Sequence, residues 1–77
     1  MTWVSFIWTE AALKADPEYD PARENIVKIL CDLDDLHRAR PYLDHWKQQG
    51  RTVEINTNKN TLEIKVNGFV MYERELS

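Results

Sequence analysis

The chain has few of the features from which an activity or a cellular compartment can be read directly. Of its 77 residues only Cys31 is a cysteine, so no disulfide can form within the chain. Because the sequence has a single thiol and shows no signal peptide, we expect a reducing, cytoplasmic location. The apolar run over residues 3–8 is far too short to span a bilayer.

Residues that could bind a metal or carry out catalysis are present but lack the required spacing. Zinc sites use closely spaced pairs of ligands, and His37, His45 and Cys31 form no such pair. Asp32 and Asp35 fall on a helix face that we expect to be solvated, whereas acid–base catalysis needs carboxylates in a cleft. We therefore expect a protein that is not an enzyme, with no metal, no cofactor and no catalytic residue.

The chain also has no excess of positive charge. Thirteen acids oppose ten Lys and Arg residues, which gives a formal net charge of −3. Nucleic-acid binding relies on many basic residues that reach phosphates, and attachment to anionic membranes needs a similar surplus. We therefore expect no direct nucleic-acid binding and no membrane attachment, and a protein partner instead.

The composition predicts one small globular domain. A chain with 43% apolar and 30% charged residues is globular rather than disordered. A chain of this length has room for a single hydrophobic core, so residues 1–77 are predicted to form one domain.

The clearest structural signal is the dipeptide Asn67-Gly68, which lies between two runs of alternating apolar residues. Asn-Gly accepts the positive φ angles of a two-residue hairpin turn, so it predicts strands over Thr61–Val66 and 69–74. A third alternating run, Val53–Thr57, precedes them and is joined to the hairpin by a turn at 58–60. Together the three runs predict an antiparallel meander.

A regular hairpin sets which side chains of the last strand face the core. It places Met71 opposite Ile64 and buries it together with Phe69. Val70 and Tyr72 then fall on the outer face, where they form an aromatic patch of the kind found at interface centres. The alternative is that the first strand, or the loop that follows it, covers this patch.

Helical spacing dominates the middle of the chain. Asp20 is predicted as the N-cap of a helix with Pro21 at its first position, N1. Apolar residues then recur at helical spacing and form one stripe: Ile26, Ile29, Leu30, Leu33 and Leu36. Pro41 is expected to interrupt this helix, and the sequence leaves a break and a kink as alternatives there. A short second helix follows over 41–49, and Gly50 ends it.

The N-terminal segment is predicted to be a strand. Residues 2–8 are rich in aromatic and β-branched residues on both alternating faces, which is typical of an interior strand. A short turn or loop follows over 10–15. The element order is then β-α-α-β-β-β, an α+β class with two layers in which the meander packs on the amphipathic helix.

Acidic residues are concentrated in one part of the chain. Between Glu10 and Asp35 there are eight acids and three bases, whereas four bases and one acid follow over residues 36–51. An acidic helix and loop face could dock onto a basic protein groove, and the alternative is an ordinary solvated face. The residues that we assign to partner binding are Glu18, Asp20, Asp32 and Asp35, together with Val70 and Tyr72.

The leading hypothesis is a small acidic protein-interaction domain that acts as an inhibitor or adaptor of a larger partner. Compact acidic proteins of this size include phage-encoded inhibitors of host machines that bind nucleic acid. A third hypothesis is a structural homodimer formed through an unpaired strand edge.

A second hypothesis comes from the predicted layout. Strand, two helices and an antiparallel meander resembles the RelE/ParE-type toxins, and the resemblance implies RNA or protein binding through the sheet. The ribonucleases of that group use basic residues on the sheet. Here the basic residues of the meander, which are Arg51, Lys59, Lys65 and Arg74, are balanced by four glutamates. We therefore carry over no catalytic role.

Overall fold

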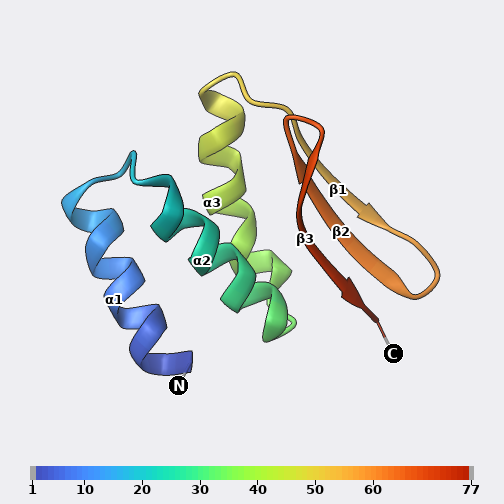
Figure 1. The fold of residues 1–77 in the computed structure, drawn as a ribbon, viewed down its shortest axis with the longest axis horizontal. Coiled ribbons are helices and arrows are strands. Elements are labelled where there is room, and N and C mark those ends of the chain that lie inside the picture. The colour runs from blue at the N-terminus through green and yellow to red at the C-terminus, as the bar shows by residue number, and fades with distance from the viewer. Residues whose placement is uncertain (1, 77) are drawn as a thin grey trace. The chain divides into compact units, whose positions relative to one another are not determined.

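The computed structural model describes residues 2–76, which form three helices followed by a three-stranded antiparallel sheet (Figure 1). The α+β class and the C-terminal meander are confirmed. The predicted element order is wrong at its first position, where a helix replaces the strand. The chain divides into two compact units, residues 1–42 and 43–77, and the single domain stays a prediction.

Helix α1, Thr2–Ala15, occupies the segment that was predicted to be a strand and a turn. Its second half is built from Ala, Leu, Glu and Lys, which are strong helix formers. Helix formation is cooperative, so a helix nucleated there extends back through the aromatic residues that suggested a strand. Thr9 and Leu13, one turn apart, are buried, and α1 packs beside α2 (Figure 1).

Helix α2, Asp20–Asp32, begins one residue away from the predicted cap. Tyr19 is the N-cap, with extended backbone and no side-chain capping bond, so the assignment of Asp20 as the N-cap is wrong. Asp20 lies instead in the first turn, where a negative charge favours the helix dipole. Pro21 lies one position after the predicted N1, still in the first turn, where a backbone amide has no partner within the helix.

The predicted apolar stripe is buried in its first part only. Ile26 and Leu30 are fully buried, and Val27 and Cys31 extend the buried face of α2 beside them. Leu33, by contrast, is 52% exposed, because the helix ends before it.

The helix break lies at residues 33–35 rather than at Pro41. Asp34 adopts a left-handed conformation with φ of 61°. Its amide donates to the Cys31 carbonyl at 3.0 Å, and the Asp35 amide donates to the Leu30 carbonyl at 2.8 Å. This pair of bonds is a Schellman ending, which glycine usually supplies. Because no glycine marks this position, the break was not predicted from the sequence.

Helix α3, Leu36–Gln48, runs through Pro41, so the predicted interruption and the separate helix over 41–49 are wrong. Proline removes one amide–carbonyl bond, and α3 keeps the bonds on either side of it. The predicted stop at Gly50 is confirmed. Gly50 has φ of 90°, its amide donates to Lys47, and the Arg51 amide donates to Trp46.

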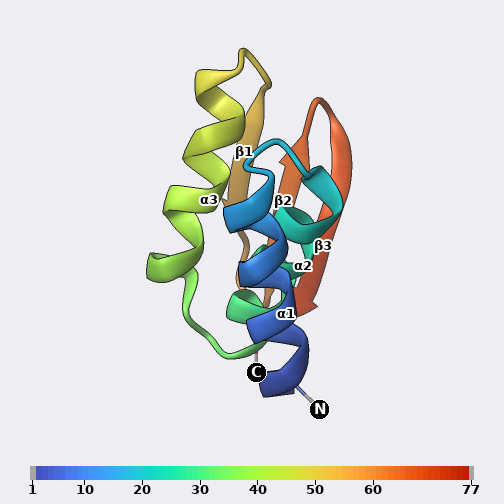
Figure 2. The same ribbon diagram turned by 90° about the vertical axis from the view of Figure 1, so that its left-hand side faces the viewer.

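The C-terminal sheet contains β1 (Val53–Thr57), β2 (Thr61–Val66) and β3 (Phe69–Glu75) in that order, as Figure 2 shows. The two-residue turn is confirmed, because Asn67 and Gly68 have φ of 53° and 83°. The Asn67 amide donates to the Thr52 carbonyl at 2.8 Å, and the Thr52 amide donates to the Asn67 side chain at 3.1 Å. Asn67 therefore also prolongs the pairing of β1 with β2.

A β-bulge in β3 overturns the predicted register. Lys65 pairs with Val70 but Ile64 pairs with Tyr72, so Met71 is an extra residue without a partner in the ladder. The predicted pairing of Ile64 with Met71 is wrong, and Tyr72 turns to the face that holds Ile64. Phe69, which we expected to be buried, is 78% exposed, and Met71 is half-buried.

One face of the sheet is buried and the other carries charge. Leu62, Ile64 and Tyr72 are the buried strand residues, and Leu43 and Trp46 in the second half of α3 are buried as well. The packing of this face on the amphipathic helix stays a prediction. No helix within residues 2–76 is long and apolar enough to cross a membrane.

Candidate functional site

The acidic residues assigned to partner binding lie at the two ends of α2. Glu18 and Asp20 lie at its start, whereas Asp32 and Asp35 lie at its end. Twelve helical steps separate Asp20 from Asp32, which is about 18 Å along the axis. Their use as one partner-binding surface stays a prediction.

Asp35 has a structural task at the start of α3. Its carboxylate accepts a bond from the Arg38 amide at 3.3 Å, and its carbonyl accepts one from the Ala39 amide at 3.2 Å. The Arg38 guanidinium also lies 3.7 Å from the Asp35 carboxylate. Asp35 is thus the N-cap of α3, a role that its place in a predicted single helix concealed.

Replacement of Asp35 by alanine is expected to lower the free energy of unfolding by about 1 kcal/mol, because the cap bond is lost. Asp35→Asn retains a capping oxygen and is expected to restore most of that loss. Urea unfolding monitored by circular dichroism measures both variants. Equal stability of the alanine variant and the parent would show that the cap contributes nothing.

The predicted patch on the outer sheet face is wrong for one of its two residues. Tyr72 is buried, with 9% of its surface exposed, because the bulge turns it inward. Val70 is 52% exposed as expected, and its exposed neighbour is Phe69. The exposed apolar surface of β3 therefore lies beside the hairpin turn.

The seam between α1 and α2 is open on both sides. Thr9 and Leu13 of α1 and Ala22 and Ile26 of α2 are buried along its middle. Successive residues of a helix are 100° apart around its axis. The residues that precede and follow each of these buried residues in the sequence therefore lie on opposite sides of the seam. Each side forms a hollow, and the two hollows have different chemistry.

The first hollow, which we call the Trp8 groove, has a volume of about 200 Å³. Trp8 is 72% exposed and Tyr19 is 48% exposed, so two large rings border it in contact with solvent. Its lining residues are Trp8, Thr9, Ala12, Tyr19, Pro21, Ala22 and Asn25. Exposed Trp and Tyr are the residue types that contribute most at protein interfaces.

Tyr19, which lines the Trp8 groove, lies in an acidic turn. We give this name to Asp16, Glu18 and Asp20, of which Glu18 and Asp20 flank Tyr19 in the sequence. The Asp16 side chain accepts a bond from the Glu18 amide at 3.1 Å, and its carbonyl accepts one from the Tyr19 amide at 3.0 Å. These bonds hold the backbone of the turn in place. The charges of Glu18 and Asp20 act on Arg23, which donates to the Pro17 carbonyl of the same turn.

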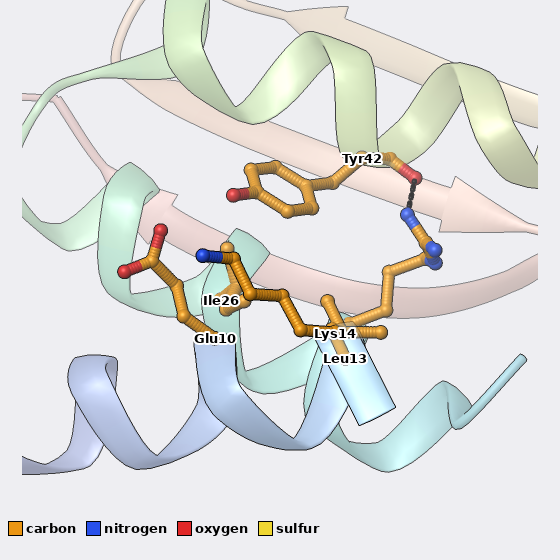
Figure 3. Close-up of a pocket in the computed structure, with 6 residues that line it drawn as sticks. Glu10, Leu13, Lys14, Ile26 and Tyr42 are labelled. Carbon is orange, nitrogen blue, oxygen red and sulfur yellow. Dashed lines mark hydrogen bonds between the residues drawn. The ribbon is translucent and has the colours of Figure 1, made fainter. Parts of the chain in front are cut away.

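The second hollow, the Arg23 pocket, lies on the other side of the seam and has a volume of about 190 Å³. In Figure 3, Glu10 and Lys14 reach from α1 toward the Tyr42 ring. Leu13 and Ile26 supply the apolar part of its lining. Charges of both signs therefore lie at the same pocket, one acid, Glu10, and two bases, Lys14 and Arg23.

Arg23 is a buried cation with 6% of its surface exposed. Its two terminal nitrogens donate to the Pro17 carbonyl at 2.8 Å and the Tyr42 carbonyl at 3.3 Å; Figure 3 marks the second bond. Burial lowers the pKa of Arg23, while the charges of Asp20 and Glu18 act in the opposite direction. Arg23 therefore ties α2 to the preceding loop and to α3 through its two terminal nitrogens.

The sequence interpretation missed Trp8 and Tyr19 as surface residues. Trp8 belonged to a predicted interior strand, and Tyr19 to an unassigned loop. The sequence carried one signal for Tyr19, which lies between Glu18 and Asp20. Acidic residues are rarely buried, so a residue between two of them is expected near the surface.

The reactive residue types lie apart from these hollows. Cys31 is a free thiol and is buried. Among residues 2–76, no group of three or more His, Cys, Asp or Glu side chains is arranged to hold a metal ion.

The first element also bears on the resemblance drawn from the layout. The RelE/ParE-type order begins with a strand, and this chain begins with α1. That resemblance therefore loses the element on which it depended. No protein-family model, curated protein or solved structure matches the chain.

Proposed function

We propose that this chain is a non-enzymatic protein-interaction domain that acts as an inhibitor or adaptor in the cytoplasm. The observation that carries the proposal is the pairing of the Trp8 groove with the acidic turn. A Trp side chain that is 72% exposed beside a hollow is costly to keep in water unless a partner covers it. The acids that flank Tyr19 in the sequence favour a partner with a basic surface.

The proposal uses only one end of the acidic segment. Glu18 is exposed and adjoins Tyr19, a lining residue of the groove, in the sequence, whereas Asp32 is exposed at the far end of α2. Asp35 is occupied as a cap, and Asp20 supports the first turn of α2. Glu18 and Asp32 therefore make a matched pair of charge reversals, of which only the first should affect binding.

The test is affinity capture from lysate of the native host at low and moderate salt, with bound proteins identified by mass spectrometry. We expect one stoichiometric protein partner whose recovery falls at moderate salt. Glu18→Lys should reduce recovery about tenfold or more, and Asp32→Lys should leave it unchanged. Circular dichroism confirms that both variants are folded.

Three other outcomes would contradict parts of the proposed function. Loss of capture with Asp32→Lys alone would place the contact at the end of α2 and contradict the use of the groove. Recovery of RNA or ribosomes would contradict a protein partner. An empty lane with concentration-dependent size in solution would favour the structural homodimer.

A further inference from the structure

Two opposite charges at the Arg23 pocket are not paired within the fold. Glu10 and Lys14 lie four residues apart on α1, a spacing at which glutamate and lysine favour an ion pair. Glu24 and Lys28 on α2 have the same spacing and pair at 2.9 Å. Glu10 and Lys14 do not pair with each other. Among the side chains that the structure describes, neither has an ion-pair or hydrogen-bond partner.

Both charged side chains reach over an apolar surface. Figure 3 shows Glu10 and Lys14 extending from α1 toward the Tyr42 ring. Leu13 and Ile26, which are 8% and 0% exposed, line the same pocket, so its apolar wall belongs to the buried seam. The volume of about 190 Å³ is below the roughly 300–1,000 Å³ of pockets that hold drug-sized ligands. The pocket therefore suits a molecule of the size of a single amino acid.

Arg23 also lines the pocket, but its charge is engaged within the fold. Its terminal nitrogens donate to two backbone carbonyls, and the charges of Glu18 and Asp20 act on it. The charges available to a ligand are therefore those of Glu10 and Lys14. An ion of one sign would be attracted by one of them and repelled by the other, whereas a ligand with both signs satisfies the two together.

We propose that the Arg23 pocket binds a free α-amino acid with an aliphatic side chain. The ammonium group of the ligand donates to the Glu10 carboxylate, and its carboxylate accepts from the Lys14 ammonium. Its side chain packs against Leu13 and Ile26. An α-amino acid carries its two charges on one carbon atom, which matches two side chains that reach the same ring from adjacent turns of one helix. This site is separate from the Trp8 groove and goes beyond the proposed function.

The experiment titrates the folded, ¹⁵N-labelled chain with L-leucine and follows the backbone amide signals of residues 10–14 and 23–26. We expect saturable shifts of those signals. N-acetyl-L-leucine lacks the ammonium charge and L-leucinamide lacks the carboxylate, while both retain the aliphatic side chain. Each should bind about tenfold more weakly than leucine, because one charged hydrogen bond is lost and one protein charge stays unpaired.

Variants assign each charge of the ligand to its residue. Lys14→Gln should weaken the binding of leucine and N-acetyl-leucine several-fold and should not weaken that of leucinamide. Glu10→Gln should weaken leucine and leucinamide and should not weaken N-acetyl-leucine. Asn25→Ala changes the Trp8 groove on the other side of the seam and should leave all three titrations unchanged. The three side chains retain exposed surface, so the variants are expected to fold, which circular dichroism checks.

Three results overturn the inference. The absence of a saturable shift with leucine shows that the pocket takes no amino acid. Binding of leucinamide or N-acetyl-leucine as tight as that of leucine shows that one of the two charges is not recognised. Leucine binding that is unchanged in both Lys14→Gln and Glu10→Gln places the ligand elsewhere. Partner capture is measured separately and depends on Glu18, so the failure of either proposal leaves the other standing.

Discussion

Replacement of Arg23 by alanine is expected to lower the free energy of unfolding by about 3 kcal/mol. Arg23 is almost fully buried, and its guanidinium donates to the carbonyls of Pro17 and Tyr42. Hydrogen bonds from a charged group contribute more than neutral ones, and their loss leaves two carbonyls without these donors. The loss therefore affects both the loop that precedes α2 and helix α3.

Two further variants separate the causes of that loss. Arg23→Met retains much of the apolar packing and removes the donors, whereas Arg23→Lys retains the charge but cannot supply the forked pair of bonds. We expect both to be less stable than the parent and more stable than the alanine variant. Urea unfolding followed by tryptophan fluorescence measures all three. A methionine variant as stable as the parent would mean that the buried bonds add nothing net.

The second large effect is expected from the sheet. Ile64 is fully buried in the central strand β2, and Ile64→Ala is expected to lower the free energy of unfolding by about 2–5 kcal/mol. The cost combines the lost transfer free energy of the side chain with the cavity that it leaves. Phe69→Ala is the matched control, because Phe69 is apolar but 78% exposed, and it should change stability by about 0.5 kcal/mol or less.

The Arg23→Ala and Ile64→Ala variants together test whether residues 1–77 unfold as one domain. Arg23 lies in the first compact unit and Ile64 in the second. If there is one cooperative transition, each substitution lowers the protection of amides in both units against hydrogen exchange. If the units unfold separately, each substitution affects only the amides of its own unit.

The segments that were predicted correctly from sequence have local causes. Asn67-Gly68 and Gly50 need positive φ, and glycine or asparagine at such positions is visible in the sequence. The stripe through Ile26 and Leu30 follows from helical spacing alone. Each of these signals depends on a few neighbouring residues and no others.

The errors arose where a local signal was weak or misleading. Residues 2–8 carry strand-forming side chains, but the helix formers that follow them extend a helix through the segment. The break at 33–35 uses Asp34 in a conformation that glycine normally adopts, so Pro41 was the more obvious candidate. The bulge in β3 has no marker residue, and it reversed the predicted exposure of Tyr72.

The candidate site was predicted only in part, because it depends on how α1 and α2 pack. Glu18 and Asp20 were identified from charge alone, and they flank Tyr19, which lines the groove. Trp8 could not be placed at that surface while its segment was assigned to a strand. A surface formed by two helices becomes visible only when both helices are known.

The bulge at Met71 also determines how β3 responds to changes in length. Every other residue from Phe69 to Glu75 has a Cα partner in β2, and those partners would form an uninterrupted ladder if Met71 were absent. Loss of this one residue would leave each remaining pair intact and straighten the strand. Loss of a residue after Met71 would instead shift the pairs beyond it and turn their side chains to the opposite face. Position 71 is therefore where homologous chains of this fold can differ in length by one residue without exchanging the inside and outside of the sheet.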